Sequence, residues 1–123
     1  MKEVSVLHFS PTGGTKKIAD HLAQAVAAVQ NEFDLTVPVL KSHTMAADVP
    51  VVVAVPVFAG RVPARAITAL KECRGNGAPT VAVVVCGNRA YEDALLELRD
   101  CLTEQGFNVI AAGAFIARHS MLG

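Results

Sequence analysis

The chain has 123 residues, 52% of them hydrophobic, and its 11 basic and 11 acidic side chains leave no net charge. This length predicts a single domain, residues 1–123, with one core, and the neutral balance excludes the basic surface that nucleic-acid binding requires. Prolines, glycines and charges interrupt every apolar run before the ~20 residues that a membrane span needs, so we expect neither a nucleic-acid partner nor a membrane.

The cysteines and the N-terminus indicate a reducing compartment. Cys73, Cys86 and Cys101 are odd in number and fit no Cys-x-x-Cys spacing, so the sequence encodes neither a disulfide framework nor a zinc or iron–sulfur site. The first residues lead straight into an apolar strand and leave no room for a signal peptide. We therefore expect a cytoplasmic protein without a metal site.

Apolar runs of strand length alternate with helical patterns, which is typical of a parallel sheet covered by helices. The expected strands cover residues 3–9, 35–39, 51–55, 80–85 and 109–115. A helix follows the first strand, and its apolar stripe consists of Ile18, Leu22, Ala25, Val26 and Val29. Further helices are expected over residues 63–72 and 91–105. Since the run 51–55 is apolar throughout, it fits a central strand that is buried on both faces.

The segment between the first strand and the first helix has the features of a phosphate-binding loop. It reads Phe-Ser-Pro-Thr-Gly-Gly-Thr-Lys-Lys over residues 9–17. Its glycines let the backbone pass close to a ligand, and the hydroxyls of Ser10, Thr12 and Thr15 stand beside N–H groups that the new helix leaves unpaired. An anion is therefore the expected ligand.

Several common phosphate loops do not match this segment. A nucleoside-triphosphate loop needs Gly-x-x-x-x-Gly-Lys-Ser/Thr, but here Thr15 separates Gly14 from Lys16. A dinucleotide loop needs Gly-x-Gly-x-x-Gly, whereas these glycines are adjacent. A cysteine phosphatase needs a thiol in the loop, and the segment has none. The pattern that remains is Ser/Thr-x-Thr-Gly-x-Thr.

Two more loops follow the carboxyl ends of the third and fourth expected strands. Residues 56–63 read Pro-Val-Phe-Ala-Gly-Arg-Val-Pro, and residues 86–93 read Cys-Gly-Asn-Arg-Ala-Tyr-Glu-Asp. Each loop has an aromatic residue, Phe58 or Tyr91, in a chain with only 5 Phe and 1 Tyr. A broad aromatic ligand would gain roughly 0.5–1.5 kcal/mol from stacking on each ring.

Together the three loops resemble those of the flavodoxin family. The first resembles the loop that holds the FMN phosphate in that family, and the other two resemble the loops that place one aromatic on each side of the flavin. The likeness covers nearly the whole chain and is closest to flavodoxin-like domains with Pro-Val-Phe/Tyr-Ala-Gly-Arg-Val-Pro in the second loop. It implies an α/β fold with a doubly wound, five-stranded parallel sheet of order 2-1-3-4-5, which binds its ligand beyond the carboxyl ends of the strands.

The resemblance implies an FMN-dependent electron-transfer flavoprotein whose chemistry comes from the flavin, with no side chain acting as nucleophile or base. The first loop would hold the phosphate, Phe58 and Tyr91 would sandwich the ring, and backbone groups of the last two loops would meet its polar edge. The residues that the resemblance assigns to the cofactor are Ser10, Pro11, Thr12, Gly13, Gly14, Thr15, Phe58, Ala59, Gly60, Arg61, Cys86, Gly87, Asn88 and Tyr91.

Simpler interpretations exist for several of these residues. The second-loop aromatic could close the end of the sheet, and Tyr91 could cap the helix that it begins. Arg61 could be a solvated loop residue, and Cys86 could be a small buried apolar residue. Ala59 stands where a glycine would turn more easily, at a cost of about 1 kcal/mol if it must adopt a positive φ. His8, within the first strand, is expected to pack in the core.

The zero net charge of the chain indicates what kind of redox partner it has. Flavodoxins are strongly acidic, which helps them to dock on basic partners, and this chain lacks that field. We therefore expect a redox partner protein, or a fused or associated ferredoxin-type domain.

Two other functions use the same scaffold. An NAD(P)H-dependent FMN or quinone reductase remains an alternative, although the sequence has no second nucleotide motif that would support it. A non-catalytic receiver-like domain would need acidic residues after the first strand, where the chain has His8-Phe9-Ser10.

The last expected strand ends near Phe115, whereas the resembled fold continues into a fifth helix. Without that helix, apolar side chains of the third to fifth strands should lie uncovered on the face that carries the first helix. Monomers seldom expose a patch of several hundred Å². We therefore expect either a C-terminally truncated product or a homodimer.

Overall fold

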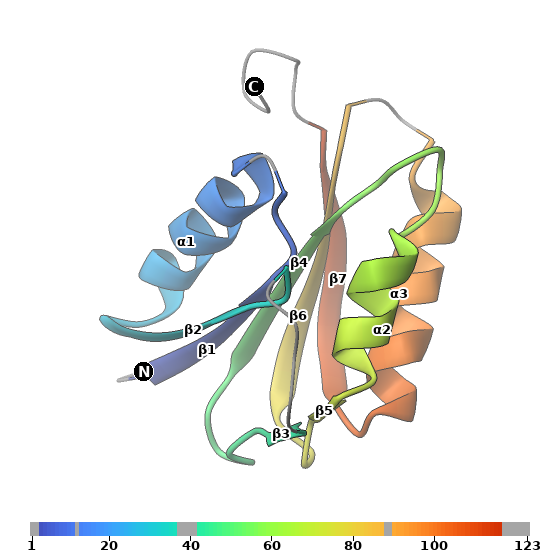
Figure 1. Ribbon diagram of the computed structural model, residues 1–123. Helices are drawn as coiled ribbons and strands as arrows, with labels where there is room; N and C mark the ends of the chain where they lie inside the picture. Colours follow the sequence, from blue (N-terminus) through green and yellow to red (C-terminus); the bar gives the residue numbers. More distant parts are fainter. Residues whose placement is uncertain (1–2, 12, 37–41, 88–89, 117–123) are drawn as a thin grey trace.

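The structure is a computed structural model that describes residues 3–11, 13–36, 42–87 and 90–116. The strands of its main parallel sheet are β1 (Glu3–His8), β2 (Val29–Asp34), β4 (Val51–Pro56), β6 (Pro79–Cys86) and β7 (Asn108–Ile116). The helices are α1 (Gly14–Val26), α2 (Ala64–Leu70) and α3 (Glu92–Glu104). A short parallel pair, β3 (His43–Thr44) and β5 (Cys73–Arg74), forms a separate sheet that the sequence did not predict. Helix α1 covers one face of the main sheet, and α2 and α3 cover the other (Figure 1).

The strand order confirms the predicted topology. The main sheet runs β2-β1-β4-β6-β7, which is 2-1-3-4-5 when its strands are counted along the chain, and every neighbouring pair is parallel. The chain moves outward in one direction from β1 to β2 and in the other from β4 to β7. The topological switch point therefore lies between the carboxyl ends of β1 and β4, where open α/β sheets bind their ligands.

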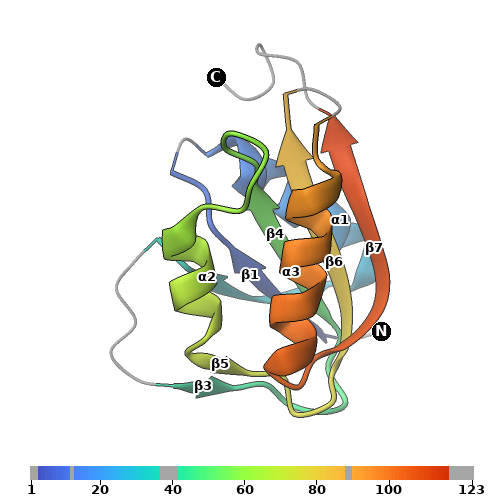
Figure 2. The ribbon, with the colours of Figure 1, turned by 90° about the vertical axis from the view of Figure 1, so that its right-hand side faces the viewer.

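Two apolar layers enclose the sheet. On one face, Leu7 of β1 packs in a cluster with Leu70 of α2 and Leu98 of α3. Figure 2 shows α2 and α3 side by side over this face, with β7 along the edge of the sheet. On the opposite face, valines of β1, β4 and β6 pack against the alanines of α1. All of β4 is buried, which confirms the prediction of a central strand.

Helix α1 buries a different stripe from the one predicted. Ala19 and Ala23 are buried against the sheet, whereas Ala25 and Val26 are exposed. Small side chains at this i, i+4 spacing let the helix approach the sheet closely, so that the larger side chains lie at its flanks. The helix also ends at Val26, which places residue 29 at the start of the next strand.

The second strand lies earlier than predicted. It covers Val29–Asp34, not residues 35–39, of which 37–39 lie outside the described residues. β2 is an edge strand that pairs only with β1, and its sequence Val-Gln-Asn-Glu-Phe-Asp mixes polar and apolar residues. Because an edge strand is partly solvated, its apolar pattern is weak. Leu35 is buried just after the strand, where its amide donates to the His8 carbonyl at 2.8 Å.

The uncovered apolar area on the α1 face of the main sheet is smaller than the sequence predicted. Val83 and Val85 of β6 are buried in the α1 cluster, so the expectation was wrong for the third and fourth strands of the main sheet. It holds for β7, where Ile110 is 63% exposed and Phe115 is also exposed. A groove of about 330 Å³ lies between this strand and α1, and it is lined by Gly14, Lys17, Ile18, His21, Leu22 and Phe115.

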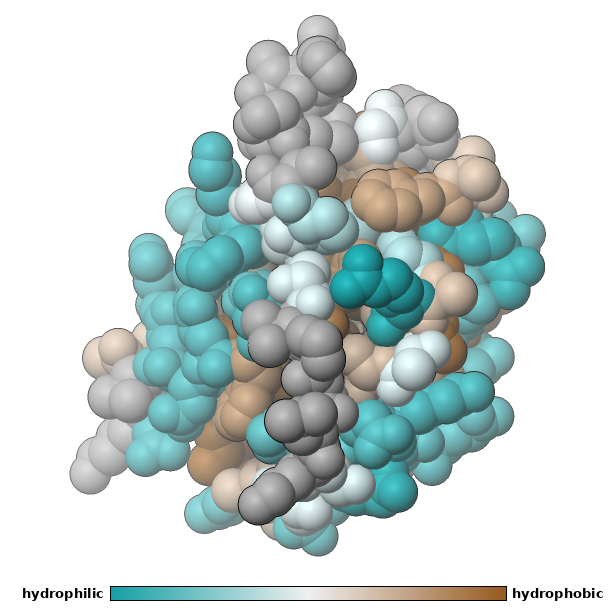
Figure 3. All heavy atoms as spheres, viewed as in Figure 1, coloured by the Kyte–Doolittle hydropathy of each residue, from teal (hydrophilic) through white to brown (hydrophobic). Residues whose placement is uncertain are grey.

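The outer side of α1 is largely hydrophilic, whereas apolar atoms appear at the upper right and lower down in the middle of this face (Figure 3). In the part of the chain that the structure describes, no helix has the length and apolar character needed to cross a membrane.

The packing of α3 is testable with two leucines of the same helix. Leu98→Ala should lower the free energy of unfolding by roughly 2–5 kcal/mol, because it leaves a cavity under a fully buried side chain. Leu96→Ala, at a position 47% exposed, should change it by less than about 0.5 kcal/mol. Urea denaturation measures both values, and equal losses would contradict the assigned faces of α3.

Candidate functional site

The three loops singled out in the sequence lie together at one edge of the sheet. Because β1, β4 and β6 are parallel, their carboxyl ends meet at this edge. Backbone bonds continue the pairing into the loops: the amide of Phe9 donates to Ala54 at 3.1 Å, and that of Val57 donates to Val85 at 3.0 Å. Between the second and third loops lies a cavity of about 320 Å³, lined by Val57, Ala59, Gly60, Cys86, Gly87 and Ala90.

The first loop wraps the N-terminus of α1. The hydroxyl oxygen of Ser10 accepts a hydrogen bond from the Lys16 amide at 2.9 Å, which satisfies one donor of the first helical turn. Gly13 has a φ of 90°, in the left-handed region that favours glycine, and its amide donates to the Ser10 carbonyl at 3.3 Å. Pro11 is exposed at the turn, and Thr12 lies outside the described residues. The loop is thus shaped locally by Ser10 and Gly13.

Two amides of the first helical turn, those of the buried residues Gly14 and Thr15, have no intrahelical acceptor. Among the described residues, none accepts a hydrogen bond from the amide of Gly14 or Thr15. These groups lie at the positive end of the helix dipole, where an anion is stabilised. The donors present therefore fit a phosphate group.

The charge of Lys16 is compensated within the protein. Its Nζ lies 2.7 Å from Asp20 Oδ2 and 3.4 Å from Glu32 Oε2, and the hydrogen bond to Asp20 raises the pKa of the lysine. Nearby, His8 is 2% exposed, as the sequence predicted, and its Nε2 lies 3.8 Å from Glu32 Oε2. An anion at the first loop would therefore depend mainly on backbone donors and hydroxyls.

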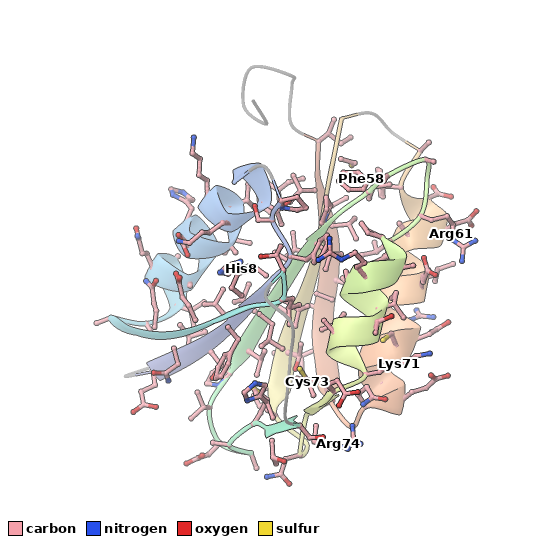
Figure 4. The ribbon with its side chains drawn as sticks, viewed as in Figure 1. His8, Phe58, Arg61, Lys71, Cys73 and Arg74 are labelled. Atoms are coloured by element: carbon pink, nitrogen blue, oxygen red, sulfur yellow. The ribbon has the colours of Figure 1, made fainter. Side chains whose placement is uncertain are left out.

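The second loop turns sharply at its aromatic residue. Phe58 and Arg61 exchange two backbone hydrogen bonds, of 2.9 and 3.0 Å. Ala59 and Gly60 between them have φ values of 52° and 80°, which define a type I′ turn. Ala59 therefore does adopt a positive φ, which costs an L-residue roughly 1–2 kcal/mol. Phe58 is 53% exposed at the upper edge of the molecule, so it does not close the end of the sheet (Figure 4).

Arg61 extends over α3 and forms a forked ion pair with Glu97. Its Nε donates to Oε1 at 3.2 Å and its Nη2 donates to Oε2 at 2.8 Å, on the outer side of the helix (Figure 4). In the structure the Arg61 side chain binds Glu97. Its predicted contact with a cofactor is not tested by this arrangement and stays a prediction. Glu97 was missed in the sequence because it lies 36 residues from Arg61 and belongs to no local motif.

The third loop combines a buried start with a half-buried aromatic. Cys86 is buried, and its thiol donates to the Phe115 carbonyl at 3.5 Å, which fits the interpretation of a small core residue. Tyr91 precedes α3 and packs partly against the core, without a side-chain hydrogen bond that caps the helix. A Cβ at Gly60 would lie 4.0 Å from the Ala90 carbonyl, so the two loops approach closely. Asn88 lies outside the described residues.

Cys73 lies far from these loops, at the opposite end of the sheet (Figure 4). Burial raises the pKa of its thiol to about 11. Since the thiolate is the reactive form, this cysteine stays protonated and inert near neutral pH.

Comparisons with protein-family models and with curated protein sequences find no match. Solved structures do match. A candidate flavoprotein from Bacteroides eggerthii DSM 20697 has a TM-score of 0.69 and 14% identity, over 99% of this chain and 94% of that chain. Oxidised Flavodoxin 1 from Bacillus cereus has a TM-score of 0.61 and 14% identity, over 98% and 90%. The rubredoxin oxygen:oxidoreductase of Desulfovibrio gigas has a TM-score of 0.66 and 16% identity, over 99% of this chain and 33% of that chain. The chain therefore has the flavodoxin-like α/β fold that its loops implied.

The strain at Ala59 predicts a stabilising substitution. Ala59→Gly relieves the cost of the positive φ but adds freedom to the unfolded chain worth about 0.4–1 kcal/mol, so the net gain should be positive and up to about 1 kcal/mol. Ala25→Gly, at an exposed position within α1, should instead lose roughly 0.5–1 kcal/mol. Thermal or urea unfolding measures both, and a loss at both positions would contradict the strained turn.

The ion pair predicts a dependence on pH. Hydrogen bonds from Arg61 hold the pKa of Glu97 below its ordinary value of 4.5. Because the folded-state pKa is lower than the unfolded-state pKa, the ionised carboxylate stabilises the folded protein at pH values above the unfolded-state pKa. That stabilisation is lost as the pH falls through the folded-state pKa. The stability difference between the unmodified protein and Glu97→Gln should therefore be small but measurable at pH 7 and should shrink below about pH 4.5. Urea unfolding from pH 7 to 3 measures it, and a constant difference would refute the ionic contribution.

Proposed function

We propose that this chain is an FMN-binding domain that transfers electrons. The observation that carries the proposal is that two first-turn amides of α1, which have no acceptor among the described residues, lie at the same edge of the sheet as the cavity between the second and third loops, at the topological switch point. The matched structures support it, since two of them are described as a candidate flavoprotein and a flavodoxin. The residues at this edge fit the two ends of FMN, a phosphate and a broad aromatic ring.

The first loop would hold the phosphate. The amides of Gly14 and Thr15 at the N-terminus of α1 would donate to it, and the hydroxyls of Ser10, Thr12 and Thr15 would supply further donors. Since Lys16 is already paired with Asp20 and Glu32, the phosphate charge would be stabilised by these fixed dipoles. Such donors need no rearrangement when the anion binds.

The second and third loops would hold the ring. Phe58 would offer an exposed face and Tyr91 a half-buried one, and Gly60 and Gly87 line the cavity between the two loops. When bound, FMN supplies reversible one- and two-electron redox chemistry. The side chains of this protein bind and orient it and exclude water from one face, and none is assigned as nucleophile or base.

The net charge of the chain indicates the kind of redox partner. With no net charge, the domain has little long-range attraction for a freely diffusing partner, so we propose a redox partner that is fused to it or tightly associated, of the ferredoxin type. The match to one third of the larger rubredoxin oxygen:oxidoreductase supports this view, because there the same fold forms part of a larger redox protein. We propose that the domain and its redox partner are cytoplasmic.

The phosphate assignment is tested with two ligands. Thr15→Val removes a hydroxyl whose bond to a charged oxygen is worth roughly 1.5–3 kcal/mol, so the Kd for FMN should rise about ten- to a hundredfold, and that for riboflavin far less. Thr103→Val, at an exposed position on α3, is the matched control and should change neither. Titration of the apoprotein by flavin fluorescence measures the constants. The unmodified protein failing to bind FMN, or equal losses for both ligands, would reject the assignment.

A further inference from the structure

The Glu97 carboxylate accepts three hydrogen bonds from the second loop, although it lies in the middle of α3 and not in any of the three loops. Its Oε1 accepts from Arg61 Nε at 3.2 Å and from the Val62 amide at 3.0 Å. Its Oε2 accepts from Arg61 Nη2 at 2.8 Å. Two consecutive residues of the second loop are thus held by one carboxylate, in the forked geometry that gives an Arg–carboxylate pair its directional specificity.

These bonds fix one end of the turn that faces the cavity. The other end is fixed by the Val57 amide, which donates to the Val85 carbonyl of β6 at 3.0 Å. Between the two anchors lie Phe58, Ala59 and Gly60, the residues proposed to meet the flavin ring. Beyond them, Val62 is buried in the core. The turn is therefore held from both sides, by β6 and by α3.

The conformation of the turn explains why such a hold is needed. Ala59 has a φ of 52°, a conformation that L-residues leave readily unless the surroundings impose it. If the Arg61 end were released, Ala59 could return to a negative φ. That change would rotate the adjoining peptides and move Phe58 and Gly60 relative to the cavity. The bonds to Glu97 oppose this relaxation.

The same carboxylate also sets the second loop against the third. Helix α3 begins directly after Tyr91, so Glu97 lies on the helix into which the third loop leads. The two loops approach at Gly60, where a Cβ would lie 4.0 Å from the Ala90 carbonyl. A link from the second loop to α3 therefore fixes the width of the cavity of about 320 Å³ between the loops.

The exposure of Arg61 means that the pair contributes little to global stability. The Arg61 side chain is 66% exposed and that of Glu97 26%, and ion pairs with a solvated partner contribute little to folding. We propose that Glu97 is a positioning residue, which acts through Arg61 and Val62 to hold the second loop in the shape that receives the flavin ring. This proposal rests on the proposed FMN function.

The test measures loop order and flavin binding in Glu97→Ala, Glu97→Gln and Arg61→Lys, with Asp100→Asn on the same helix as the matched control. In the apoprotein, amide hydrogen exchange at Arg61 and Val62 should accelerate at least tenfold in Glu97→Ala and remain unchanged in Asp100→Asn. The Kd values of FMN and of riboflavin should rise together, by about three- to tenfold, because the ring end is affected and the phosphate end is not. Glu97→Gln and Arg61→Lys, which keep the size of the side chain, should show the same pattern to a smaller extent.

A double variant separates positioning from simple structural support. In Glu97→Ala, adding Ala59→Gly should recover most of the lost affinity for both flavins, because glycine keeps the positive φ without the hold from α3. Structural damage elsewhere would not be rescued at position 59. Unchanged flavin affinity in Glu97→Ala, a loss confined to FMN, or no rescue by the second substitution would overturn this proposal while leaving the FMN function intact. Absence of FMN binding by the unmodified protein would overturn both.

Discussion

The parallel pairing of β4 between β1 and β6 is the constraint on which the rest of this structure depends. Because all six residues of β4 are buried, its partners must cover both of its edges and helices must cover both of its faces. Parallel strands end at the same edge of a sheet, so this arrangement brings the loops after β1, β4 and β6 together. The site is thus a consequence of how the core is built.

The two ends of the site rely on different physics. At the proposed phosphate end, Ala19 and Ala23 let α1 lie close to the sheet, with its N-terminus near the switch point between β1 and β4. These donors belong to a rigid helix and need little support. At the proposed ring end, the turn around Ala59 is strained and is bonded to β6 on one side and to α3 on the other.

Electrostatics within the protein reinforce this division. Lys16 of the first loop segment and Arg61 of the second are each paired with carboxylates of the protein. A bound anion would then be stabilised by oriented dipoles, and the second loop would be ordered by an ion pair on its outer side. Charge is used here for placement of the backbone more than for direct attraction of a ligand.

The sequence by itself determined the features that depend on local patterns. The apolar run 51–55 revealed the central strand, the spacing in residues 91–105 revealed α3, and the glycines and hydroxyls after β1 marked the loop at the start of α1. The strand order came from the resemblance of the loops, since spacing alone allows several orders. Only the tertiary structure decided the position of β2, the alanine face of α1 and the pairing of Arg61 with Glu97. An edge strand has a weak apolar pattern, the buried face of a helix depends on how closely it can approach its sheet, and a contact between residues 36 positions apart exists only once the chain is folded.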